Sequence, residues 1–254
     1  MTPPRFIEPA WPAPEGAIAL STLRCGGVSA GAFVSFNLGH HVGDIPAAVV
    51  ANRESLVAGL PENTQVQWLS QVHGTRVIQA LGDDNYPEAD ACWTDQPGIA
   101  CAVMTADCLP VLFCTADGKK IGAAHAGWRG LVSGVLEATV AAIGVDPASL
   151  LAWLGPAIGP ISFEVGPEVE QAFSQASSEE LRDATGACFT ASNVRPGYYL
   201  ADIYALARLR LSALGLDRVY GGEHCTVTES ERFFSYRRDG QTGRMATLIL
   251  LNPS

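Results

Sequence analysis

The sequence contains little charge and little histidine, and almost no lysine. Of its 254 residues, 17% are charged, five are histidine, and only Lys119 and Lys120 are lysine. The 26 acidic residues outnumber the 16 basic ones and give a formal net charge of −10 at pH 7. A general nucleic-acid binder normally presents a basic face, so this balance argues against that class of partner. It leaves room for a local basic pocket, because the other bases are arginines, which suit bidentate binding of phosphate or carboxylate.

Long apolar runs are also missing. No segment approaches the roughly 20 apolar residues that span a bilayer. The proline-rich start, MTPPRFIEPAWPAPEG, lacks the continuous apolar stretch of a signal peptide. We therefore expect a cytoplasmic protein that does not associate with membranes. The seven cysteines are irregularly spaced and form no CxxC pair, so in a reducing compartment most of them should be free thiols.

Two common functional motifs are absent. The chain has no P-loop and no GxGxxG. Nucleoside triphosphate binding and a Rossmann dinucleotide site therefore lack support.

The apolar pattern predicts short strands mixed with helices, without a regular βαβ order. Predicted strands lie at 17–22, 68–72, 75–80, 99–104, 110–115, 120–125, 150–154, 217–220 and 247–251. The second and third of these are expected to pair around His73 and Gly74. Predicted helices lie at 45–59, 131–143, 167–175 and 200–214. We expect one α+β domain over residues 1–254, with a mixed β-sheet core flanked by helices and an irregular lead-in at 1–16.

Three residues suited to zinc lie where predicted strands end in turns. His73 is in QVHG, Cys108 in TADCLP and His125 in AAHAGWRG. Catalytic zinc sites use three protein ligands and leave one position open, and imidazole and thiolate are suitable donors. The separations of 35 and 17 residues match no local metal motif, so on spacing alone a core thiol and two hydrogen-bonded histidines remain an alternative.

Arginines and glycines occur together in two predicted loops. GWRG, with Arg129, follows a predicted strand and precedes a helix, where backbone N–H groups favour anions. FFSYRRDGQTGR supplies Arg237 and Arg238, with Arg244 close behind. Together with a metal, these loops suit a substrate that carries phosphate or another anion, although ordinary surface salt bridges would explain them too.

The motifs resemble those of the YfiH family, the laccase-domain family once labelled multicopper polyphenol oxidase. The order TLRCGGVS, SFNLGHHVGD, QVHG, TADCLPV, AHAGWRG, GPAIGP with FEVG, and FFSYRRDGQTGR is the family's order, and it covers the chain from about residue 17 to its end. The resemblance implies a fold similar to the catalytic domain of cytotoxic necrotising factor. It also implies a metal site formed by His73, Cys108 and His125, holding zinc, with copper as an alternative.

The resemblance implies a function as well. Members are described as phosphorylases of adenosine, inosine and methylthioadenosine, with adenosine deaminase activity. The expected partners are therefore a purine nucleoside and phosphate, and we expect a monomer. For phosphate we select Arg129 and Arg237, and for the ribose or the base Asn37 and Gln71.

Deamination would require a proton shuttle in addition to the metal. Asp107, beside the cysteine ligand, and Glu164, in FEVG, are the two candidates. A buried anchor for the TADC turn is an equally good interpretation of Asp107.

Three other functions stay open. A multicopper oxidase could use the trio as its first copper site, but five histidines cannot readily supply the remaining ones. A cysteine hydrolase that acts on cell-wall precursors would use Cys108 as nucleophile and His125 as base. The third alternative is a metal-dependent binding protein without catalytic activity.

Overall fold

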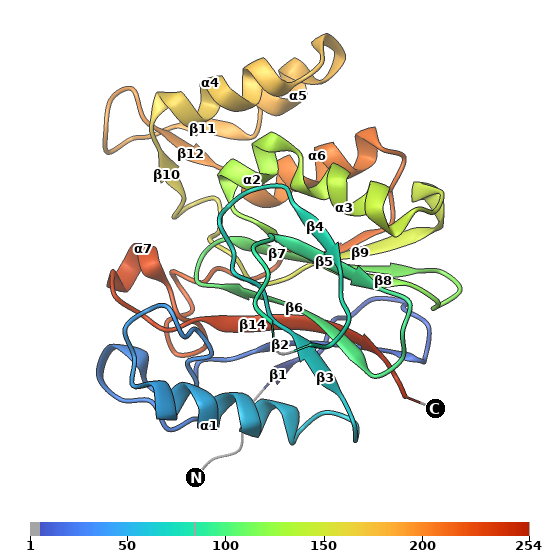
Figure 1. Cartoon of the computed structure of the whole chain (residues 1–254). Coiled ribbons are helices and arrows are strands. Elements are labelled where there is room, and N and C mark those ends of the chain that lie inside the picture. Colours follow the sequence, from blue (N-terminus) through green and yellow to red (C-terminus); the bar gives the residue numbers. More distant parts are fainter. Residues whose placement is uncertain (1–5, 84, 254) are drawn as a thin grey trace.

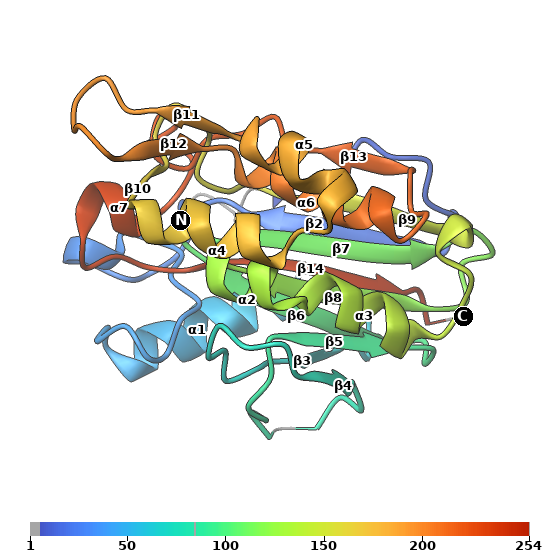
Figure 2. The ribbon, with the colours of Figure 1, turned by 90° about the horizontal axis from the view of Figure 1, so that it is seen from above.

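The computed structural model describes residues 6–83 and 85–253, and it arranges them in stacked layers (Figure 1). Two large mixed sheets lie face to face between helices. Helix α1 (Pro46–Val57) covers the outer face of one sheet. Helices α2 (Trp128–Ser133), α3 (Val135–Ile143) and α6 (Ile203–Ala213) lie across the outer face of the other, as Figure 2 also shows. The predicted mixed sheet flanked by helices is confirmed.

The two large sheets are built from strands distant in the sequence. In spatial order, the five-stranded sheet contains β1 (Phe6–Ile7), β2 (Ala17–Thr22), β14 (Met245–Leu251), β6 (Ile99–Thr105) and β3 (Gln65–Gln67). The six-stranded sheet contains β13 (Val219–Gly221), β9 (Leu150–Leu154), β7 (Leu109–Thr115), β8 (Ile121–Ala126), β5 (Ala91–Thr94) and β4 (Val77–Gln79). The pairs β3–β6, β4–β5 and β9–β13 are parallel, and the other pairs of these sheets are antiparallel.

A smaller unit lies beyond the helical layer. It contains the three-stranded sheet β10 (Glu164–Val165), β12 (Tyr199–Ala201) and β11 (Phe189–Ala191), with helices α4 (Pro167–Ala176) and α5 (Arg182–Gly186) (Figure 1). The remaining helical segments are α7 (Tyr236–Asp239) and three 3-10 turns, η1 (Gly31–Phe33), η2 (Pro147–Ser149) and η3 (Glu179–Leu181). No helix within the described residues is long and apolar enough to cross a bilayer.

The strands are apolar on both faces because each large sheet is covered on both sides. Along β7, Val111 and Phe113 pack toward the helices, whereas Leu112 and Cys114 pack between the sheets. This alternation follows from the two-residue period of a strand. It also explains the continuous apolar runs in the sequence.

Several predicted elements match the structure closely. The strands predicted at 17–22, 99–104, 110–115, 120–125, 150–154 and 247–251 all form. The pair predicted around His73 is wrong. Residues 68–72 contain only an isolated bridge, Ser70 with Glu88, and β4 pairs with β5 instead. The lead-in, expected to be irregular, contributes β1 to the edge of a sheet.

Two predicted helices differ from the observed ones: one is interrupted, and the other begins later in the chain. The helix expected at 131–143 is two helices, because Gly134 between them has a left-handed backbone with φ of 100°. The helix expected from residue 200 begins at Ile203, after β12. Asp202 caps it, and its carboxylate accepts a hydrogen bond from the Ala205 N–H at 3.0 Å.

Substituting Gly134 with alanine tests the break between α2 and α3. The nearest atom to an added Cβ is Glu137 Oε2 at 3.6 Å, so space is available and the left-handed backbone is the obstacle. We expect Gly134→Ala to lower the free energy of unfolding by about 1–2 kcal/mol in urea titrations. Gly186→Ala is the control: it lies in α5 with no atom within 4 Å of its added Cβ and no left-handed backbone. Equal effects of the two substitutions would contradict this explanation.

Candidate metal centre

His73, Cys108 and His125 meet at one end of the stacked sheets. Cys108 lies in the turn where the chain passes from β6 in one sheet to β7 in the other, and His125 is near the end of β8. One donor atom from each of the three lies within 4.8 Å of the others. The Cys108 sulfur is 3.8 Å from His73 Nε2, and the two imidazole centroids are 4.8 Å apart. The three side chains that the sequence predicts as one metal site therefore do lie close together.

A glycine makes room for this approach. A Cβ on Gly127 would lie 2.9 Å from both the Cys108 sulfur and His73 Cδ2. Any side chain at this position would therefore displace two of the three donors.

The buried carboxylate of Asp90 positions both histidines. Its Oδ1 accepts hydrogen bonds from His125 Nδ1 at 2.8 Å and from the His73 N–H at 2.9 Å. Its Oδ2 accepts from the Gly74 N–H at 2.6 Å and the Val72 N–H at 3.2 Å. The bond to Nδ1 leaves Nε2 of His125 for a metal, which is the usual arrangement behind a metal-bound histidine. The backbone bonds hold the His73 turn, where His73 has a left-handed φ of 61°.

Asp90 was not selected from the sequence. There it closes an acidic loop and directly precedes the apolar segment ACWT. An acid at the start of a buried strand must find donors inside the protein. The position of Asp90 directly before a buried strand is therefore the feature of the sequence that indicates its role.

Asp107 acts as an anchor for the turn that carries Cys108. Its backbone is left-handed, with φ of 93°. Its carboxylate accepts hydrogen bonds from Thr226 Oγ1 and from the Arg237 N–H, both at 2.6 Å. Both oxygens are thus engaged by residues far away in the sequence, which supports the anchor interpretation over a proton shuttle.

The thiol and the imidazole stabilise each other's charged forms. Burial alone would raise the pKa of Cys108, but the neighbouring His125 and His73 outweigh it and lower this pKa to about 6. Burial alone would lower the pKa of His125, but Cys108 and Asp90 raise it to about 9. Near neutral pH, the metal-free site therefore holds a thiolate beside an imidazolium.

The donor set fits a divalent metal. Two imidazole nitrogens and one thiolate suit zinc or copper, and three ligands leave a position open, as in catalytic zinc sites. The group is the only cluster of this kind found among the described residues.

Two cavities share His73 and Cys108 in their linings. The first, of about 260 Å³, is mainly apolar and is lined by Trp128, Ile158, Phe163 and Ile203, with Arg129 and Arg237. Most of the surface of the second, of about 380 Å³, is apolar too, but more of its lining side chains are polar or charged, namely those of His41, Gln71, Thr105, His125 and Arg244. Tyr236 lines both and is 62% exposed. We name them after their lining side chains as the apolar cavity and the polar cavity.

The predicted ligand-binding residues divide among three environments. Arg129 and Arg237 line the apolar cavity, and Gln71 lines the polar one. The Gln71 amide, however, exchanges two hydrogen bonds of 2.8 Å with the Met104 backbone. Gln71 therefore extends the edge of β6, and only the rest of its side chain is available to a ligand.

Asn37 and Glu164 lie outside both cavities. Asn37 is fully buried, and its amide bonds Gly39, Asp44 and the Arg244 N–H. Glu164 accepts a hydrogen bond from Ser192 Oγ at 2.6 Å and pairs with Arg195 at 3.5 Å. On a strand, neighbouring side chains alternate faces, so Phe163 reaches the apolar cavity and Glu164 points away. These two site predictions are not supported by the structure.

Three cavity-lining residues were not selected from the sequence. His41 lies in a loop, Tyr236 begins the short helix α7, and Arg244 directly precedes β14. Periodicity gives no information on which side chains of such irregular segments turn inward.

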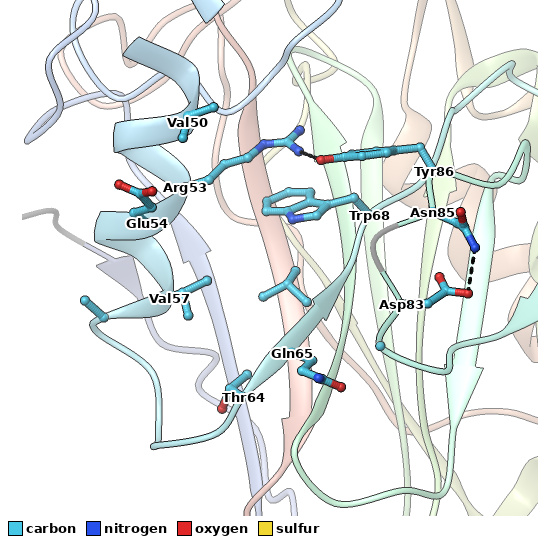
Figure 3. A pocket seen from close by; sticks show the side chains of 13 residues that line it. Val50, Arg53, Glu54, Val57, Thr64, Gln65, Trp68, Asp83, Asn85 and Tyr86 are labelled. Carbon is cyan, nitrogen blue, oxygen red and sulfur yellow. Dashed lines mark hydrogen bonds between the residues drawn. The ribbon is translucent and has the colours of Figure 1, made fainter. Parts of the chain in front are cut away.

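A larger cavity lies elsewhere, between α1 and residues 64–68, 82–83 and 85–86 (Figure 3). Its volume is about 890 Å³. The Arg53 guanidinium lies 4.1 Å above the Trp68 ring and donates to Tyr86 Oη at 2.8 Å. This cavity contains none of the three metal-site residues, so the chemistry of the donor set, not size, identifies the candidate site.

Comparison with known proteins places the chain among close relatives. Residues 18–252 match the family described as multi-copper polyphenol oxidoreductase laccase. A Pseudomonas aeruginosa protein named purine nucleoside phosphorylase is 51% identical over 97% of this chain and 98% of its own. The Escherichia coli purine nucleoside phosphorylase YfiH is 50% identical over 97% and 99%. A Neisseria meningitidis crystal structure, 51% identical, superposes with a TM-score of 0.89 over 98% of this chain and 99% of that one.

The protonation of His125 predicts how metal binding depends on pH. With pKa values of about 6 for Cys108 and about 9 for His125, a metal that binds between these pH values must displace the proton of His125. The apparent affinity for zinc should therefore rise roughly tenfold per pH unit in this range and more steeply below it. Calorimetry at pH 7.5 in two buffers with different ionisation enthalpies should detect about one proton released per metal. An affinity independent of pH would refute the assignment.

Removing the charge of Asp90 tests its positioning role. We expect Asp90→Asn to lower the affinity for zinc by roughly 10–100-fold, because the orientation of His125 and the turn of His73 both depend on the carboxylate. Competition with a chelating dye measures this change. Asp183→Asn, exposed on α5, is the matched control and should leave the affinity unchanged. Unaltered binding in Asp90→Asn would show that the backbone alone holds the donors.

Proposed function

The chain belongs to the multi-copper polyphenol oxidoreductase laccase family, and we propose that it is a purine nucleoside phosphorylase. Its substrates would be phosphate and adenosine, inosine or methylthioadenosine. The observation that carries the proposal is that the three donors line two cavities to which three arginines also contribute. The names of the relatives agree with it.

The reaction requires two substrates beside each other. An oxygen of HPO₄²⁻ forms a bond to C1′ of the nucleoside while the bond from C1′ to the purine nitrogen breaks. The electron pair of that bond leaves with the purine, which takes up the hydrogen of HPO₄²⁻. The products are ribose 1-phosphate and the free base. Positive charge develops on the sugar and negative charge on the base, so catalysis depends on fixed charges and donors around them.

The two cavities supply such an environment. Arg129 and Arg237, our sequence-based candidates for phosphate, line the apolar cavity, and Arg244 lines the polar one. The apolar walls exclude water, which strengthens the electrostatic interactions.

We propose zinc as the resident metal, held by His73, Cys108 and His125. When bound, zinc would act as a Lewis acid and lower the pKa of a nearby water molecule, which is the chemistry that deamination of adenosine requires. Adenosine deamination remains a second candidate activity on the strength of this donor set. Two observations weigh against it: Glu164 lies outside both cavities, and Asp107 lines the apolar cavity but has both carboxylate oxygens engaged in hydrogen bonds. Phosphorolysis is therefore the better supported of the two.

The pair of Cys108 and His125 favours one alternative, a cysteine hydrolase. The pKa of the Cys108 thiol is lowered and that of the His125 imidazole is raised, as is typical of activated thiols. Such an enzyme would act without metal, which separates it from the phosphorylase. A multicopper oxidase is less well supported, because five histidines in the chain cannot complete its copper cluster.

Product analysis with and without phosphate tests the function. We expect about one zinc per chain by mass spectrometry, and adenine with ribose 1-phosphate from adenosine only when phosphate is present. Chelation or His73→Ala should reduce the rate by at least 100-fold, and zinc should restore the chelated protein. Inosine formed without phosphate would instead indicate deamination. Activity that survives chelation but not alkylation of thiols would indicate the hydrolase, and no turnover of any nucleoside would refute the proposal.

A further inference from the structure

The side chains that line the two cavities differ: aromatic and aliphatic ones predominate in the first, and polar or charged ones in the second. We propose that Arg244 binds the phosphate in the polar cavity, that the purine occupies the apolar cavity, and that Tyr236 separates them. This inference rests on the proposed function and assigns the substrates to places within the same site. It moves the phosphate away from Arg129 and Arg237.

Arg244 is a half-buried cation without a carboxylate partner among the described residues. Burial lowers the pKa of its guanidinium, which reflects the cost of keeping the charge away from water. Buried arginines are normally paired with an anion. A phosphate in the polar cavity would supply that anion and accept charge-assisted hydrogen bonds from it.

The Arg244 side chain is fixed in place before any ligand binds. Its Nη1 donates to the Thr242 and Gly243 carbonyls, both at 3.0 Å. These bonds leave Nε and Nη2 without an acceptor among the described residues, and both can donate to an anion. A side chain held in this way loses little conformational entropy when it binds an anion.

The loop of residues 37–44 supports Arg244 from one side. Asn37 Oδ1 accepts a hydrogen bond from the Arg244 N–H at 2.9 Å. A Cβ on Gly39 would lie 2.8 Å from Arg244 Cγ, so the side chain passes directly over this glycine. Asn37, expected to touch the substrate, is therefore a positioning residue for Arg244. His41, from the same loop, adds an imidazole to the polar cavity.

The arginines of the apolar cavity are already engaged by its aromatic walls. The Arg129 guanidinium lies 4.6 Å from the centroid of Trp128, and that of Arg237 lies 5.7 Å from the centroid of Phe163. Arg237 Nη1 also donates to the Ser162 carbonyl at 3.2 Å. Flat apolar walls bordered by cations suit a purine, which has apolar faces and polar edges. Tyr236, on the boundary, lies 6.0 Å from the Arg244 guanidinium.

Calorimetric titration of the zinc-loaded protein with inorganic phosphate tests the assignment without catalysis. We expect Arg244→Gln to weaken phosphate binding by at least tenfold, the loss typical of a charged hydrogen-bond donor, and Arg244→Lys to recover part of it. Arg129→Gln and Arg237→Gln should change the affinity for phosphate by less than threefold. Arg195→Gln, on the surface of the small unit, is the matched control. Zinc content and melting temperature would show that each variant is folded.

Steady-state kinetics provides the second measurement. Arg244→Gln should raise the KM for phosphate, whereas Arg237→Gln should raise the KM for the nucleoside. The inference is overturned if the wild-type protein binds no phosphate, or if Arg129→Gln or Arg237→Gln removes phosphate binding and Arg244→Gln does not. If phosphate binds through Arg244 but no nucleoside is turned over, the anion site stands and the proposed function is wrong.

Discussion

The candidate site depends on one buried carboxylate. Asp90 is fully buried, and it accepts hydrogen bonds from both histidine segments of the trio. A buried charge is tolerated only when donors surround it, and here the donors are the groups that must be fixed for metal binding. The hydrogen bonds that offset the cost of burying Asp90 are therefore the same bonds that fix the geometry of the site. A substitution that removes them would destabilise the buried carboxylate and loosen the metal-binding residues together.

The stacking of the two large sheets provides the other constraint. The chain crosses from one sheet to the other at residues 106–108, between β6 and β7, and this crossing carries Cys108. Asp107 holds the crossing through bonds to Thr226 and Arg237. The crossing, α2 and the C-terminal loop thus all contribute residues that line the two cavities. Their relative positions are set by the packing of the layers.

Much of the fold could be predicted from the sequence. The strands of the layered core have apolar runs bounded by turns, and most of their predicted limits are close to the observed ones. The prediction failed at residues 68–72, where the chain is held by an isolated bridge and side-chain bonds such as those of Gln71, which leave no periodic pattern. It also failed at Gly134, because a left-handed glycine breaks a helix without changing its apolar pattern.

The site could be predicted only in part, for a related reason. His73, Cys108 and His125 are of types that bind metals, so residue type and a position at the ends of predicted strands sufficed to select them, although no strand forms before His73. Asp90, His41 and Arg244 are selected by three-dimensional contacts between distant segments. Asn37 illustrates the converse: its motif marks it as important, but its amide supports Arg244 instead of facing a cavity.

The position of β14 has a consequence for how the chain folds during synthesis. This strand, Met245–Leu251, lies between β2 and β6 in the five-stranded sheet, yet every other strand precedes it in the chain. While β14 is still inside the ribosome, the edges of β2 and β6 that it will join are unpaired, and the layer that packs against the site is incomplete. Completion of the core must wait until these residues emerge. Until then, the nascent chain exposes strand edges that are prone to aggregation, which is the situation in which cells use chaperones.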